Sequence, residues 1–101
     1  MNTLRRTEQF MHWYARLKDN VVKARIAARL KYALLGNFGD HKSVGGGVME
    51  MRIHMGPGYR IYYARSGDTV YVLLLGGNKR TQEADIKEAQ KLWKALQETS
   101  A

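Results

Sequence analysis

The second half of the sequence holds a group of side chains suited to chemistry on a phosphate ester. We identify five candidate catalytic residues: Glu50, His54, Arg60, Lys79 and Arg80. Such chemistry needs a group that accepts a proton, cations that balance charge on the phosphate oxygens, and a donor that protonates the leaving oxygen. Arginine, lysine, histidine and glutamate together can fill these roles.

The cations differ in how well they suit phosphate. The planar fork of an arginine matches phosphate oxygens better than a lysine does, which favours Arg60. The alternative is that Arg60 is a solvated strand residue paired with Glu50 across a hairpin. Lys79 and Arg80 follow a glycine pair and precede an expected helix, whose first N–H groups favour anions. They are otherwise ordinary loop charges, and Asn78 departs from the P-loop pattern.

Proton transfer and base recognition have weaker candidates. A histidine titrates near neutral pH, so His54 is a candidate acid or base, and Glu50 a candidate base. Arg52 is expected beside His54, as a contact to nucleic acid. Tyr62 is expected on the same face as Arg60, where it either stacks on a base or packs at the rim of the sheet.

The elements that carry these residues can be read from the apolar pattern. Residues 7–18 have apolar side chains at helical spacing, with Thr7 as the expected N-cap. A second helix is expected from residues 19–20, which offer a cap, to Gly36. It carries Lys23, Arg25 and Arg29, which either contact nucleic acid, bind an acidic protein segment or form a solvated surface.

Three strands and a final helix follow. Residues 36–47 include five glycines, and we expect a mobile loop there. Residues 48–55 alternate with period two, which places Glu50, Arg52 and His54 on one solvent-facing side of a strand. Further strands are expected at residues 59–64 and 70–75, the latter in the interior of the sheet. Apolar spacing from Ile86 to Leu96 indicates the last helix.

This order predicts an α+β fold in one domain, residues 1–101, with two N-terminal helices, an antiparallel sheet of three to four strands and a C-terminal helix. We expect the helices to cover one face of the sheet and to leave the other exposed and basic.

The charge and composition narrow the function. The formal net charge is +8 in 101 residues, with the excess in the N-terminal third, which indicates an anionic partner. Cysteine is absent, the three histidines are not closely spaced, and we therefore expect no metal site and no cofactor. The polar N-terminus lacks a signal-peptide pattern and no apolar run approaches spanning length, so a cytoplasmic protein without a membrane partner is expected.

Two stretches of sequence resemble a known family. They read GVMEMRIHMGPGYRIYY at residues 47–63 and LLLGGNKRTQ at residues 73–82, followed by ADI at residues 84–86. They closely resemble the phage-derived, HigB-like branch of the RelE/ParE toxins of type II toxin–antitoxin modules. The resemblance implies a microbial RNase-like fold with an added N-terminal strand near residues 2–5 beside the last strand.

The resemblance also implies a function. It implies a ribosome-dependent, metal-independent endoribonuclease that cuts messenger RNA, neutralised by an antitoxin that is usually a helix-turn-helix DNA-binding protein. It places Arg60 where relatives bind phosphate. Two departures are plain: Ile86 stands where the best-known nucleases have a tyrosine, and Glu50, Arg52 and His54 replace their lysines. A ParE-like DNA gyrase inhibitor and an inactive nucleic-acid- or antitoxin-binding relative therefore remain alternatives.

Overall fold

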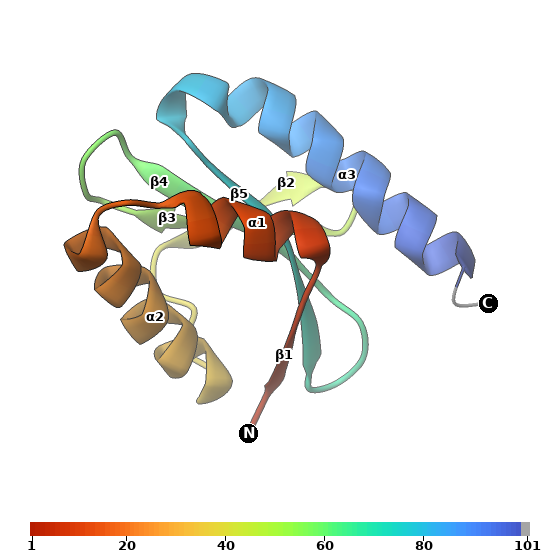
Figure 1. Ribbon diagram of the computed structural model, residues 1–101. Helices are drawn as coiled ribbons and strands as arrows, with labels where there is room; N and C mark the ends of the chain where they lie inside the picture. Colours follow the sequence, from red (N-terminus) through yellow and green to blue (C-terminus); the bar gives the residue numbers. More distant parts are fainter. Residues whose placement is uncertain (100–101) are drawn as a thin grey trace.

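The computed structural model describes residues 1–99 (Figure 1). Its elements are β1 (Thr3–Arg6), α1 (Glu8–Arg16), α2 (Asn20–Leu34), β2 (His41–Gly45), β3 (Val48–Ile53), β4 (Tyr59–Arg65), β5 (Val70–Asn78), the short 3-10 helix η1 (Lys79–Thr81) and α3 (Gln82–Thr99). The predicted α+β class and the order of helices and strands are confirmed. Within the described residues, none of the helices combines the length and the apolar character needed to cross a lipid bilayer.

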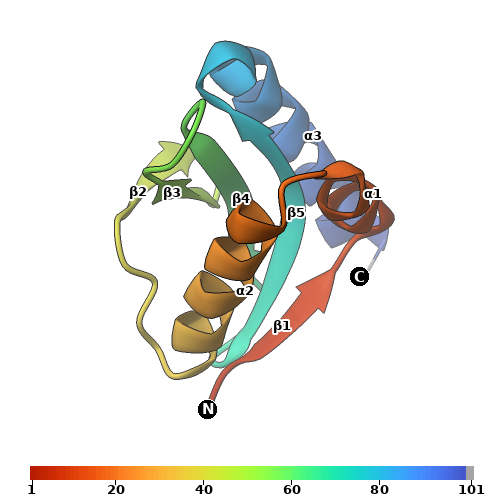
Figure 2. The same cartoon turned by 60° about the vertical axis from the view of Figure 1, so that its left-hand side comes forward.

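The sheet has five strands, one or two more than expected, in the order β1-β5-β4-β3-β2. β1 pairs in parallel with β5, and the other neighbours are antiparallel, so the sheet is mixed. The N-terminal strand implied by the family resemblance is present beside β5, as Figure 2 shows. β5 lies between β1 and β4, which confirms the prediction that the most apolar strand is internal.

The glycine-rich segment is not the loop that its composition predicted. Its second part forms β2, which pairs with β3 and is irregular between Ser43 and Gly45. Its first part is held by Arg29 of α2, whose guanidinium donates to the carbonyls of Phe38 at 3.0 Å and Arg52 at 2.7 Å. Pairing with the next strand of the chain therefore overrides the local preference of glycine for irregular structure.

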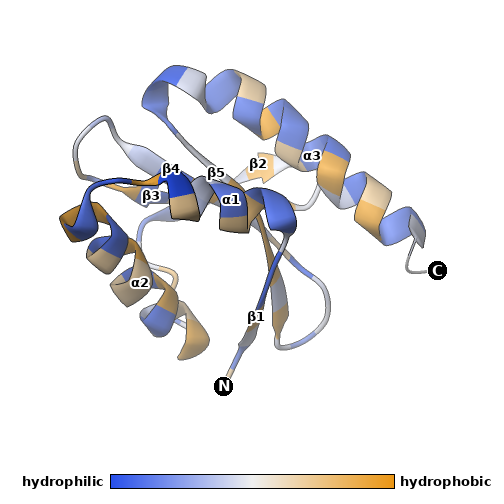
Figure 3. Ribbon diagram, viewed as in Figure 1, coloured by the Kyte–Doolittle hydropathy of each residue, from blue (hydrophilic) through white to orange (hydrophobic). Residues whose placement is uncertain are grey.

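Helices cover both faces of the sheet, so the expectation of one exposed basic face is wrong. α1 and α2 pack on one face, over a core that includes Phe10, Ile26 and Ile61. α3 packs on the other, where Trp93 and Ala89 contact a second core that includes Tyr62. Figure 3 shows hydrophobic and hydrophilic residues interleaved along α2 and α3, the pattern of helices with one buried side.

The N-terminal caps of the first two helices follow the sequence prediction. The Thr7 hydroxyl accepts from the Phe10 amide at 3.0 Å, and the Asp19 carboxyl accepts from the Val21 amide at 2.9 Å. These bonds satisfy amides that have no partner inside the helix. They fix where the chain turns from β1 into α1, and from α1 into α2.

The glycine pair that was expected to end the third strand lies inside β5. A side chain at Gly76 would overlap the Trp13 ring of α1, and one at Gly77 would overlap the Asp85 carboxyl of α3. The two glycines face opposite sides of the strand, so each lets a helix approach the backbone. β5 therefore continues to Asn78 and delivers Lys79 close to the start of β4.

Candidate cationic site

A surface pocket of about 530 Å³ lies where β3 ends, β4 begins and η1 follows β5. Its lining residues are Arg52, His54, Met55, Gly56, Pro57, Gly58, Arg60 and Lys79. Four of the residues named from the sequence therefore meet here, three of them cationic and the fourth a histidine. Arg60 and Lys79 both line the pocket, whereas Arg80 is exposed and does not.

Arg60 is held in place from two sides. Its side chain is only 12% exposed, with Nη1 donating to the carbonyl of Gly58 at 2.6 Å and Nε lying 3.8 Å from Oε2 of Glu50. Both sequence interpretations thus have some basis, because Arg60 pairs with Glu50 and also lines the pocket. It is not a freely solvated strand residue.

The turn before β4 brings Arg60 and Lys79 together. Gly58 has a φ of 77°, a conformation that side chains other than glycine rarely adopt. A Cβ atom there would lie 3.0 Å from Nη1 of Arg60 and 3.5 Å from Cβ of Lys79. The Lys79 amide donates to the Pro57 carbonyl at 3.3 Å, which ties η1 to the same turn.

Two arginines stand directly opposite each other on neighbouring strands. Arg52 of β3 and Arg60 of β4 are cross-strand partners, an arrangement that like charges normally disfavour. Each is balanced by its own carboxyl group, Asp40 at 3.0 Å from Arg52 and Glu50 beside Arg60. The buried Nε atoms of both arginines have no hydrogen-bond partner among the described residues. The pocket therefore gathers three cationic side chains, two of which are paired with carboxyl groups.

His54 is linked to Asp40, a residue that sequence analysis treated only as part of the loop. Nε2 of His54 lies 2.5 Å from Oδ2 of Asp40, and the histidine side chain is 76% exposed. This hydrogen bond, with the nearby Arg52 charge, holds the pKa of Asp40 below its usual value. Asp40 and His54 are fourteen residues apart, and no local spacing pattern indicates the contact.

Glu50 does not lie on a solvent-facing surface, so its predicted exposure is wrong, and Tyr62, expected either to stack on a base or to pack at the rim of the sheet, is buried beside it. Each is completely buried beneath α3. The Tyr62 hydroxyl donates to Oε2 of Glu50 at 3.2 Å, and Nε2 of Gln82 donates to the same oxygen at 2.9 Å. Burial, followed by the Glu50 charge, raises the pKa of Tyr62. In this conformation Tyr62 has no exposed ring on which a base can stack.

The helix start after β5 is not an open anion site, contrary to the sequence interpretation. The Asn78 side chain accepts from the amides of Arg80 at 2.9 Å and Thr81 at 3.3 Å. The Thr81 hydroxyl oxygen accepts from the Asn78 amide in return, which completes a capping box. These amides are therefore occupied, and Lys79 contributes to the pocket through its side chain.

The three basic residues of α2 that were candidates for binding nucleic acid have different surroundings in the fold. The Arg29 guanidinium is bound to backbone carbonyls, and burial lowers its pKa, so it is not free to reach a nucleic acid. Nζ of Lys23 lies 4.8 Å from the centre of the Tyr14 ring. Arg25 is exposed. Of the three, only Arg25 is exposed, and all lie outside the cationic pocket.

A metal site within residues 1–99 would need several ligating side chains close together. No group of three or more histidine, cysteine, aspartate or glutamate side chains in that range is arranged to hold a metal ion. Ile86, in the first turns of α3, packs against the core beneath that helix, as its periodicity predicted. Among the residues that line the cationic pocket, His54 is the one of a type that exchanges protons near neutral pH.

Comparison with known proteins places the chain in a family. Residues 13–97 match the model of the family described as "Phage derived protein Gp49-like", so the chain belongs to the Gp49-like family of phage-derived proteins. A protein of Haemophilus influenzae, described as an uncharacterized protein, is 44% identical over 93 residues, covering 92% of this chain and 94% of the relative. No solved structure matches the chain.

Proposed function

We propose that this protein is the toxin of a type II toxin–antitoxin module, of the RelE/ParE superfamily, and that it cuts messenger RNA on the ribosome without a metal ion. Membership of the Gp49-like phage-derived family and the motif resemblance support the toxin assignment. The observation that carries the catalytic proposal is the convergence of Arg52, Arg60 and Lys79 with His54 around one pocket.

In the proposed reaction the 2′-hydroxyl of the RNA attacks the adjacent phosphorus, and the 5′-oxygen leaves. Arg60 and Lys79 bind the phosphate oxygens and balance the charge that grows on them. Because Arg60 is already fixed by Gly58 and Glu50, it need not reorganise when that charge develops. Glu50 is buried, so we assign it to holding Arg60 and not to accepting the hydroxyl proton.

His54 is the group that we assign to proton transfer, as base for the 2′-hydroxyl or as acid for the leaving oxygen. Asp40 holds one ring nitrogen of His54 and thereby favours one orientation of the ring. This arrangement replaces the tyrosine and lysines of the best-known relatives. Arg52 donates to the other oxygen of Asp40 at 3.0 Å, so the Asp40 carboxyl group is held by both His54 and Arg52.

The decisive experiment removes the Arg60 fork. Wild type, Arg60→Ala and the matched control Arg16→Ala are expressed briefly in a bacterium while the 5′ ends of cellular messenger RNA are mapped. Arg16 is an exposed arginine at the end of α1, outside the pocket. We expect new ends inside translated codons with wild type and Arg16→Ala, and at least about a hundredfold fewer with Arg60→Ala.

If Arg60→Ala cuts messenger RNA as well as wild type does, Arg60 has no part in the mechanism. If wild type is toxic while messenger RNA stays intact, the protein is not a nuclease. A DNA supercoiling assay on the same cells tests the gyrase alternative, and absence of toxicity would indicate an inactive relative. Circular dichroism of Arg60→Ala shows whether loss of activity reflects loss of folding.

The proposed partner is an antitoxin, a helix-turn-helix DNA-binding protein encoded nearby, and the proposed location is the cytoplasm. The high positive charge supports an anionic partner but does not choose between protein and nucleic acid. Co-expression with the neighbouring reading frame should abolish toxicity and yield a stable complex on purification. Undiminished toxicity with each neighbouring frame would contradict the pairing.

A further inference from the structure

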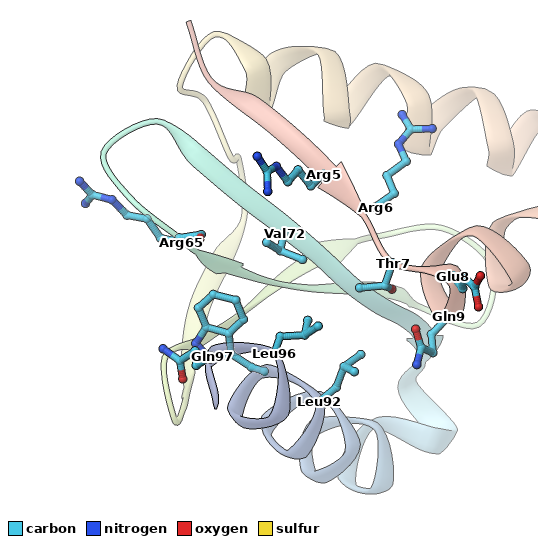
Figure 4. A pocket seen from close by; sticks show the side chains of 12 residues that line it. Arg5, Arg6, Thr7, Glu8, Gln9, Arg65, Val72, Leu92, Leu96 and Gln97 are labelled. Carbon is cyan, nitrogen blue, oxygen red and sulfur yellow. The ribbon is translucent and has the colours of Figure 1, made fainter. Parts of the chain in front are cut away.

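A second concavity, of about 740 Å³, lies between β1 and the C-terminal half of α3. Figure 4 shows Leu92 and Leu96 projecting from α3 toward the sheet, with Val72 of β5 above them. These three side chains are only partly buried and form an apolar floor. We call this concavity the edge groove.

Arginines surround the edge groove. Arg5 of β1 and Arg65 at the end of β4 line it, and one acidic residue, Glu8, lies among the lining residues. In Figure 4 the side chain of Arg6 points away from α3, so consecutive residues of β1 present cations on both sides of the strand. Neither Arg5 nor Arg6 forms an ion pair with any residue of the described chain 1–99.

The backbone of β1 is also available on its outer side. The amides of Thr3 and Thr7 donate to the carbonyls of Thr69 at 2.7 Å and Leu73 at 3.1 Å, toward β5. Because the direction of peptide groups alternates along a strand, those of Leu4 and Arg6 point the other way. β1 is the last strand of the sheet on that side, so an added strand could pair with it.

We propose that β1 and the edge groove bind an extended, acidic and amphipathic segment of a partner protein, which adds a strand beside β1. Its backbone pairs with Leu4 and Arg6, its apolar side chains cover the leucines of α3 on the face that Arg5 shares, and its carboxylates meet Arg6 on the opposite face. The inference rests on the proposed function for the existence of a protein partner. It does not require nuclease activity.

Two other occupants fit the groove less well. A second copy pairing through β1 would bring its own Arg5 and Arg6 against those of the first, and like charges across a strand pair are unfavourable. Single-stranded nucleic acid binds largely through phosphates and through bases stacked on aromatic rings. The aromatic residue of the groove, Trp93, is only 6% exposed, and the aliphatic floor would stay uncovered.

The test uses a fluorescent peptide of alternating valine and glutamate with the full-length protein. We expect saturable binding, with slowed hydrogen exchange at the Leu4 and Arg6 amides. The double variant Arg5→Glu/Arg6→Glu should bind at least about tenfold more weakly. The matched variant Arg16→Glu/Lys18→Glu, which changes the net charge equally outside the groove, should retain most of the affinity.

Several outcomes would overturn the proposal: no saturable binding, equal loss in both double variants, or unchanged exchange at Leu4 and Arg6. Protection of these amides by single-stranded RNA or by raised protein concentration would instead assign the edge to nucleic acid or to a second copy. Arg60→Ala separates the two proposals, because it should still bind the peptide. Peptide binding without RNA cleavage would contradict only the proposed nuclease activity. RNA cleavage without peptide binding would contradict only the proposed docking surface.

Discussion

The cationic pocket, near the N-terminal end of α3, and the edge groove, along its C-terminal half, hold their cations in different ways. At the N-terminal end, in the cationic pocket, Arg52 is bound by Asp40, and Arg60 by Gly58 and Glu50. At the C-terminal end, in the edge groove, Arg5 has no ion pair with any described residue and stands beside an apolar floor.

Similar charge can serve two kinds of recognition, depending on whether the cations are fixed before the ligand arrives. Cations fixed before a ligand arrives lose little freedom on binding and suit a small anion whose charge changes during a reaction. Arginines without an ion pair, such as Arg5, beside aliphatic side chains suit a broad partner that covers apolar surface and orders the charges as it binds. The comparison therefore predicts that the cationic end is rigidly packed and that the groove end tolerates change.

The close packing near the cationic pocket can be tested at Gly77, where we expect the greatest loss of stability. A methyl group there would overlap the Asp85 carboxyl, so Gly77→Ala should destabilise the protein by about 3 kcal/mol in urea unfolding. Gln97→Ala, at the exposed rim of the edge groove, should change stability by less than about 0.5 kcal/mol. Adding Asp85→Ala to Gly77→Ala should restore part of the loss, because it removes the overlapping group. Equal stability of the two single variants would erase the contrast.

The same close packing explains where sequence analysis succeeded and failed. The apolar periods predicted α1, α2, α3 and the three central strands, because those patterns follow directly from which side chains face the core. Composition did not predict β2, because its glycines indicate irregular structure, whereas Gly46 and Gly47 form the turn of a hairpin between β2 and β3. β1 came only from the family resemblance.

The candidate site was predicted in part, for a related reason. Side-chain chemistry indicated four candidate residues that the pocket contains: Arg52, His54, Arg60 and Lys79. Period two placed Glu50 on the correct face of β3 but could not show that α3 covers that face at this point. Asp40 and Gln82 reach the site across long sequence separations, although Gln82 stands within the family motif.

A smaller loss of stability is expected at Tyr62, which lies on the buried side of the cationic pocket. Tyr62→Phe removes the hydroxyl that donates to Glu50 and leaves a buried carboxyl group with one donor fewer. We expect a loss of about 1–2 kcal/mol in urea unfolding. The matched change Tyr32→Phe, at a tyrosine that is 57% exposed, should be nearly neutral. Identical stability of both variants would mean that the hydroxyl does not help to hold the Glu50–Arg60 pair.

The smallest effect concerns pH and compares one carboxylate at each end. The pKa of Asp40 is lowered in the folded protein, first by its hydrogen bond with His54 and then by Arg52, from an ordinary value of 3.8. A carboxyl group whose folded pKa is depressed stabilises the fold above its unfolded pKa and loses that contribution as pH falls through the folded value. Asp40→Asn should therefore lower Tm slightly at pH 7 and by the same amount near pH 5.

The Tm difference between wild type and Asp40→Asn should then shrink below about pH 3.8, as Asp40 becomes protonated. Asp68→Asn is the matched change at the groove end, where Asp68 is fully exposed and lies 3.5 Å from Arg65. Because an exposed ion pair contributes little, we expect it to leave Tm almost unchanged across the range. Thermal unfolding at pH 7, 5 and 3 decides between the two, and a pH-independent difference for Asp40→Asn would show that its bonds to His54 and Arg52 do not stabilise the cationic end.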